Sequence, residues 1–71
     1  MSKETLKILF EHELSICKKL KREHFDDWSE AIEHGDKVGA ECQEQLIASF
    51  TGQIMAWEQA IEYIDKEMQV C

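Results

Sequence analysis

The sequence contains no proline and only three glycines, and both scarcities bear on its secondary structure. Proline breaks the interior of a helix, because it lacks an amide hydrogen and its ring clashes with the preceding turn. Without proline, long helices run uninterrupted. Two of the three glycines, Gly35 and Gly39, lie near the middle of the chain, where they indicate a turn.

Long apolar runs are also missing. No segment approaches the roughly 20 consecutive apolar residues that a membrane-spanning helix requires. The segment MSKETLKILFEHE lacks the apolar core of a signal peptide. The three cysteines are an odd number and a poor basis for a disulfide framework. We therefore expect a cytoplasmic protein that does not enter a membrane.

Basic side chains are scarce as well, with eight Lys and Arg against fifteen Asp and Glu and a net charge of −7. Residues 1–39 carry seven basic and nine acidic side chains, whereas residues 40–71 carry one and six. A negative charge opposes nonspecific binding to phosphate backbones. We interpret the acidity mainly as an aid to solubility, with mimicry of a nucleic acid as the alternative.

What the chain does have is a helical pattern of apolar residues in each half, recurring about every 3.6 residues. The first stripe comprises Leu6, Phe10, Leu14, Cys17, Leu20, His24, Trp28 and Ile32, and the second comprises Cys42, Leu46, Phe50, Ile54, Trp57, Ile61, Ile64 and Met68. The pattern predicts one all-α domain over residues 1–71, an antiparallel hairpin of two long helices. We expect these helices over about 3–33 and 38–69, with a turn over about 34–38.

Residues near the expected helix ends support these limits. Ser2 suits an N-cap, and Gly35 suits the left-handed position that follows a helix. Asp36 or Gly39 can open the second helix. If the chain folds back at 36–38, facing residues have numbers that sum to about 74.

This pairing predicts the surroundings of the cysteines. Cys17 lies opposite Trp57, and both Cys17 and Cys42 are buried as small apolar side chains. Cys71 is expected to be available for oxidation between chains. No two cysteines of one chain come within bonding range.

Each stripe is wider than a single partner helix needs. Leu9 and Ile16 extend the first stripe on one edge, and Phe25 and Ile32 extend it on the other. A contact between two helices needs a seam of roughly 100°, which leaves apolar surface over. We therefore expect a homodimer in which two hairpins form a four-helix bundle.

Small residues form one edge of the second stripe. Ser49, Gly52, Ala56 and Ala60 follow each other at spacings of three and four. Small side chains let another helix approach closely, which would explain a mid-helix glycine that costs about 1 kcal/mol. We predict a packing seam here; the alternative is an exposed edge that tolerates the glycine.

Polar residues interrupt both stripes. Glu13, Lys21 and His24 fall within the first and Gln53 falls within the second. The pairing rule places Lys21 opposite Gln53. Buried polar groups fix register in some coiled coils, so we predict a polar belt with that role. A catalytic or ligand-binding role is the alternative.

Motifs for metal binding and catalysis are missing from the pattern. The di-iron bundles use Glu-x-x-His, but the residues three before His12, His24 and His34 are not glutamate. The sequence has no Gly-x-Ser-x-Gly and no glycine-rich phosphate loop. We therefore predict no catalytic residue, no metal, no cofactor and no enzyme activity.

One basic run stands out, over residues 18–22. Lys18, Lys19 and Arg22 point away from the predicted core and form a candidate anion-binding patch. Pairing with acidic residues three or four positions away on the same helix is the alternative.

The segment Phe50-Thr51-Gly52-Gln53-Ile54-Met55-Ala56-Trp57-Glu58 resembles the second helix of small helical-hairpin proteins encoded by tailed phages and prophages. Such proteins often carry arginines around this motif, where this chain has Gln53 and Glu58. The resemblance implies a phage or mobile-element origin, and hence a host or virion protein as partner.

The leading functional hypothesis is a non-enzymatic protein–protein interaction module that associates with itself and with a further protein not identified by the sequence. The alternative is a small nucleic-acid-binding regulatory hairpin dimer that uses Lys18, Lys19 and Arg22.

Overall fold

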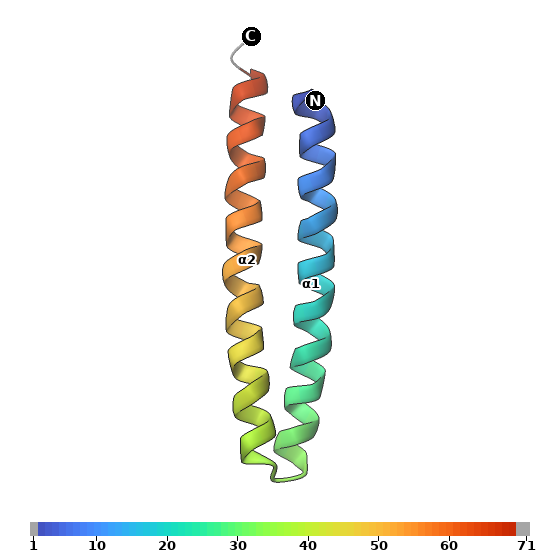
Figure 1. Ribbon diagram of the computed structural model, residues 1–71, viewed down its shortest axis with the longest axis vertical. Coiled ribbons are helices and arrows are strands. Elements are labelled where there is room, and N and C mark those ends of the chain that lie inside the picture. Colours follow the sequence, from blue (N-terminus) through green and yellow to red (C-terminus); the bar gives the residue numbers. More distant parts are fainter. Residues whose placement is uncertain (1, 70–71) are drawn as a thin grey trace.

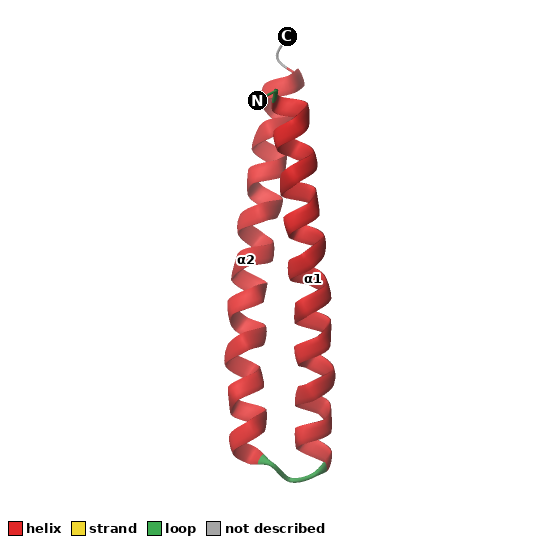
Figure 2. Cartoon of the chain, turned by 45° about the vertical axis from the view of Figure 1, so that its right-hand side comes forward, coloured by secondary structure: helices red, strands yellow, loops and turns green. Residues whose placement is uncertain are grey.

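The protein is an all-α hairpin of two long antiparallel helices, and the computed structural model describes its residues 2–69. Helix α1 spans Lys3–Glu33 and helix α2 spans Lys37–Gln69. The helices run side by side and are joined by a short turn (Figure 1). The pair is a rod of 55 × 14 × 14 Å. In the turned view of Figure 2 the helices overlap near the open end, so the pair is twisted about its long axis. The predicted helical hairpin is confirmed.

Side chains cap the start of both helices. The Thr5 amide donates to Ser2 Oγ at 3.1 Å, so Ser2 is the N-cap of α1. The Gly39 amide donates to Asp36 Oδ1 at 2.9 Å, and Asp36 opens α2 in the same way. Each cap satisfies an amide that has no partner within its own helix.

The end of α1 is a Schellman turn. The Asp36 amide donates to the Ala31 carbonyl at 2.9 Å, and the Gly35 amide donates to the Ile32 carbonyl at 3.1 Å. Gly35 has φ +71°, the left-handed conformation that this turn requires. Glycine adopts it without the steric cost that a Cβ atom adds.

Replacing Gly35 with alanine is expected to destabilise the hairpin by about 1–2 kcal/mol, the cost of a left-handed residue with a Cβ. A Cβ at this position has no heavy atom within 4 Å, so the loss reflects backbone strain alone. Asparagine tolerates this conformation, and Gly35→Asn should retain most of the stability. Urea unfolding followed by circular dichroism at one protein concentration measures the difference. Equal stability of the alanine variant and the wild type would contradict this account of the turn.

Packing between the helices follows a seven-residue repeat. Buried and half-buried side chains recur at alternating spacings of three and four, which is the pattern of a coiled coil. The repeat comprises Phe10, Leu14, Cys17, Lys21, His24, Trp28 and Ala31 on α1, and Ala40, Gln43, Ile47, Phe50, Ile54, Trp57, Ile61 and Ile64 on α2.

The expected stripes leave this seam near the turn. Ile32 is exposed while Ala31 is half-buried, and Cys42 is exposed while Ala40 is buried. A period of 3.6 drifts by about 20° per heptad from the period of 3.5 that keeps a seam facing its partner. The prediction that Cys42 is buried was therefore wrong. Cys17 is buried as predicted, and Cys71 lies outside the described residues.

The core of this hairpin is small. Within residues 2–69, Cys17, Ala40 and Ile64 are the buried apolar residues, and no polar side chain is buried. Phe10 and Trp57 pack against each other within the seam, with ring centroids 5.0 Å apart. A chain of this size with one modest core gains only about 3–5 kcal/mol from it.

Two ion pairs join the open ends of the helices. Lys3 Nζ lies 3.1 Å from Glu67 Oε2, and Lys7 Nζ lies 2.6 Å from Asp65 Oδ1. The hydrogen bond to Asp65 raises the pKa of Lys7 above its ordinary value of 10.5. Since the raised pKa favours the charged lysine, the pair supports folding at neutral pH. The part of this support that comes from the raised pKa is lost as the pH rises past the pKa of Lys7.

Candidate interaction surfaces

The residues that flank the seam fall on two opposite sides of the hairpin. On α1, Leu20 precedes the seam residue Lys21, whereas Phe25 follows the seam residue His24, so the two project to opposite sides. Because the helices are antiparallel, residues that precede a seam residue on α2 lie on the same side of the hairpin as residues that precede one on α1. Each side therefore combines residues from both helices.

One of these sides carries apolar residues from both helices, interrupted by Glu13 and Gln53. We call it the apolar face, and it comprises Leu6, Leu9, Ile16 and Leu20 on α1 with Leu46, Ala56, Ala60 and Tyr63 on α2. Four of its large side chains, Leu9, Ile16, Leu46 and Tyr63, are between 39% and 66% exposed. An open groove of about 510 Å³ at the open end is lined from both helices by Leu6, Ala60 and Tyr63, among others.

The predicted small-residue seam lies partly on this face. Ala56 and Ala60 belong to its α2 part, and Ser49 lies on the same side of α2. Gly52 lies on the flank of α2 that points away from α1, and a Cβ there has no heavy atom within 4 Å. Within one hairpin, the glycine therefore accommodates no close contact. Its role in packing stays a prediction about an assembly.

Replacing Gly52 with alanine is expected to stabilise the hairpin by about 1 kcal/mol, because glycine is a poor helix former at an interior position. The space around this site accepts the methyl group. Because Gly52 is outside the apolar face, the association state should stay unchanged. Thermal unfolding and sedimentation equilibrium of the variant test both expectations. Weaker association would show instead that a partner helix approaches the backbone at this point.

The residues of the predicted polar belt are not gathered in one cluster. His24 Nδ1 donates to Gln43 Oε1 at 2.8 Å, and the His24 ring stacks on Phe50 with centroids 5.5 Å apart. The pairing rule placed His24 near Phe50, as observed. Gln43 was missed because it falls outside the 3.6-residue stripe, although its seven-residue spacing from Phe50 marks the seam.

Gln53 has a different set of contacts. The Cys17 thiol donates to Gln53 Oε1 at 3.6 Å, and Gln53 Nε2 donates to Ser49 Oγ at 3.5 Å. Lys21 is itself a seam residue, and it lines a groove with Lys18 and Arg22 on the side of the hairpin opposite to Gln53. Whether these polar residues set the register therefore stays a prediction.

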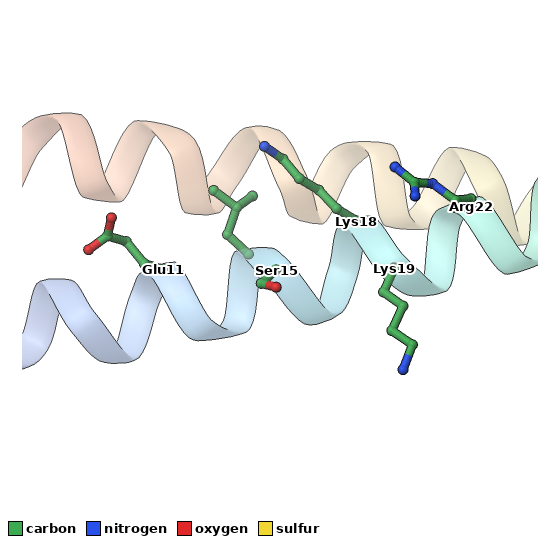
Figure 3. A pocket seen from close by; sticks show the side chains of 6 residues that line it. Glu11, Ser15, Lys18, Lys19 and Arg22 are labelled. Atoms are coloured by element: carbon green, nitrogen blue, oxygen red, sulfur yellow. The ribbon is translucent and has the colours of Figure 1, made fainter.

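The second side of the hairpin has a basic groove. Its lining is Lys18, Lys21, Arg22, Phe25 and Ile54, and a shallow depression lined by Glu11, Leu14, Ser15 and Lys19 adjoins it through Lys18 and Arg22. In Figure 3, Lys18 and Arg22 reach from α1 toward α2, whereas Lys19 points the opposite way. The groove thus brings together two members of the predicted anion patch and adds Lys21, while the third member, Lys19, lines the adjoining depression and points away from α2.

The cations of this region lack an ion-pair partner. Within residues 2–69, the lysines that form ion pairs are Lys3, Lys7 and Lys66. None of the four cations between residues 18 and 22 lies within 4 Å of a carboxylate oxygen in that described part of the chain. Pairing along the helix, the alternative explanation of this run, is therefore not what the structure shows.

Groups suited to metal chemistry do not gather in the described part of the chain. Over residues 2–69, no three His, Cys, Asp or Glu side chains lie close enough to hold one ion. In the same residues, neither helix has a segment apolar and long enough to cross a bilayer.

No family model, curated protein or solved structure matches this chain. The resemblance of the segment around Gly52 to phage hairpin proteins therefore stays a prediction. The case for a function rests on the two surfaces described above.

Proposed function

We propose that the chain is a non-enzymatic protein–protein interaction module whose apolar face packs against a second copy to form a four-helix bundle. One observation carries the proposal. Among residues 2–68, one side of the rod carries six large apolar flanking residues from both helices, the core holds three buried residues, and the other side carries four such flanking residues, Ile8, Phe25, Ile32 and Met55.

The apolar face lies on one long side of the rod. That whole side measures 55 × 14 Å, or about 770 Å², and stable interfaces bury about 800 Å² per partner, so an interface of standard size would cover the whole side, including Glu13 and Gln53. A rod of two helices with one apolar side is half of a four-helix bundle. A second copy supplies an identical face, which a two-fold axis brings into contact with the first.

Self-association also accounts for the small core. A half-exposed Leu, Ile or Tyr gains about 1 kcal/mol when the rest of its apolar surface leaves water. In a two-fold dimer each such side chain contributes twice. The apolar face therefore adds stability of the same order as the core of one hairpin, which is about 3–5 kcal/mol at most.

Sedimentation equilibrium, with helicity followed by circular dichroism, tests the proposed dimer. At micromolar concentrations in the presence of a reductant, we expect twice the 8.3 kDa mass of one chain. Dilution should lower the mass and the helicity together, because separated hairpins are marginally stable. A fully helical monomer at micromolar concentration would contradict the proposal.

Lys18, Lys19 and Arg22 have no ion-pair partner among residues 2–69, which favours one other candidate, a nucleic-acid-binding hairpin dimer. The net charge of −7 opposes it, because phosphate backbones are held mainly by an excess of positive charge. A phage or mobile-element origin, which would make the partner a host or virion protein, has only the sequence resemblance to support it.

A further inference from the structure

We propose that the basic groove docks an acidic amphipathic helix of a partner protein. The groove and the apolar face lie on opposite sides of the hairpin, so the groove stays accessible when two copies associate. The inference rests on the proposed role as a protein interaction module, but it does not depend on dimerisation.

The charge distribution singles out this groove. Residues 23–44 carry eight acidic and one basic side chain, a net charge of −7, and the rest of the chain carries seven of each sign. All the net charge therefore lies at the turn end of the rod. Lys18, Lys21 and Arg22 converge on the groove just beyond that acidic end, without carboxylate partners in residues 2–69. Carboxylates of a partner would supply the missing countercharge.

The floor of the groove is apolar and held in place. Phe25 is 51% exposed, and its ring packs against Trp28 with centroids 5.5 Å apart. Trp28 Nε1 in turn donates to Glu44 on α2 at 3.2 Å. Ile54 forms the α2 side of the groove and is half-buried. Side chains already held in one place lose little freedom when a partner binds.

A cationic rim over an apolar floor favours a helix over a nucleic acid. An amphipathic helix carries apolar side chains at spacings of three and four and carboxylates beside them, so it fits both features. A phosphate backbone would neutralise the rim but leave Phe25 and Ile54 uncovered. The guanidinium of Arg22 can hold a carboxylate through two parallel hydrogen bonds, which adds a geometric preference.

The length of the groove sets the length of the partner segment. Along α1 the groove runs from Lys18 to Phe25, and Lys19 is not among its lining residues. At 1.5 Å per residue this stretch is about 11 Å long, which is about two helical turns. Beyond Phe25 the acidic turn end repels further carboxylates, so the acidic part of the partner should lie toward the open end.

Neighbouring lysines provide a matched test of this groove. The probe is a fluorescently labelled synthetic peptide of about four helical turns, about two of which would lie in the groove, with leucines on one face and glutamates beside them. We expect its affinity, measured by fluorescence anisotropy, to fall at least about tenfold for Lys18→Glu and for Arg22→Glu. Lys19→Glu makes the same charge change on a side chain that points away from the groove, and we expect less than about a twofold loss.

Two further comparisons separate the floor from the rim. Phe25→Ser should weaken binding without any change in charge, because it removes the exposed ring of the floor. A peptide of the same composition with its leucines scattered around the helix should not bind. Circular dichroism confirms that each variant retains its helicity.

Three results would overturn the inference. The first is no binding of the amphipathic peptide at low salt, and the second is an equal loss for Lys18→Glu and Lys19→Glu, as for nonspecific attraction. The third is tighter binding of a double-stranded RNA probe than of the peptide. Sedimentation of the same samples separates the two proposals. A dimer that binds no peptide contradicts this inference alone, and a monomer that binds it contradicts only the proposed self-association.

Discussion

The double variant Leu9→Gln, Ile16→Gln is expected to be a monomer at concentrations where the wild-type chain is a dimer. Both side chains lie on the α1 side of the apolar face, and they are 46% and 39% exposed in one hairpin. Burying the rest of each side chain in the dimer is expected to stabilise the dimer by about 1 kcal/mol. Two residues in each of two copies give about 4 kcal/mol, or about a thousandfold weaker association. Sedimentation equilibrium over a range of concentrations measures this change.

The matched control is the double variant Ile8→Gln, Met55→Gln. Ile8 and Met55 are 66% and 58% exposed, more than Leu9 and Ile16, but they flank the seam on the other side of the hairpin. If general hydrophobicity drove association, this control would weaken it at least as much. We expect its dimer affinity to stay within a few-fold of the wild type. Equal losses in the two double variants would refute the assignment of the interface to the apolar face.

The second large effect is expected for Ile64→Ala, which should leave the separated hairpin largely unfolded. Ile64 is 7% exposed and is the largest of the three buried apolar residues among those that the structure describes. Truncating a buried isoleucine to alanine costs about 2–5 kcal/mol. A core of this size supplies about 3–5 kcal/mol, so little stability would remain.

Thermal unfolding followed by circular dichroism measures this loss, and it should be read at several protein concentrations. Met55→Ala is the control, because it removes a side chain of similar size that is 58% exposed and should change stability by no more than about 0.5 kcal/mol. Association should partly rescue Ile64→Ala, so its melting temperature should rise with concentration. A variant as stable as the control at every concentration would mean that the seam is not the core of this protein.

The fold was largely predictable from the sequence because the determinants of a hairpin are local. Helical periodicity, the absence of proline, Ser2, and the Gly35–Asp36 pair act over a few residues each, and the structure uses all of them as expected. Errors entered where small angular differences accumulate along a helix. The inner positions near the turn belong to Ala31, Ala40 and Gln43, and a straight 3.6-residue wheel assigns them to Ile32 and Cys42.

The surfaces were less predictable, because they depend on which flank of each helix meets which flank of the other. The basic run was visible in the sequence, but only the packed pair separates Lys19 from Lys18 and places Phe25 and Ile54 beneath the cations. The seven-residue spacing of the seam would have given this division, because Lys18 and Phe25 both follow a seam residue. The spacing of residues along one chain does not reveal which partner binds it.

The central claim is that the apolar face is the contact between two copies. Isotope-filtered nuclear Overhauser spectroscopy on an equal mixture of carbon-13-labelled and unlabelled chains tests it most directly, because it detects only contacts between copies. The account predicts such contacts from the methyl groups of Leu9 and Ile16 and from the ring of Tyr63, and none from Ile8. Contacts between copies that involve Ile8 but neither Leu9 nor Tyr63 would contradict it, as would a folded sample that shows none.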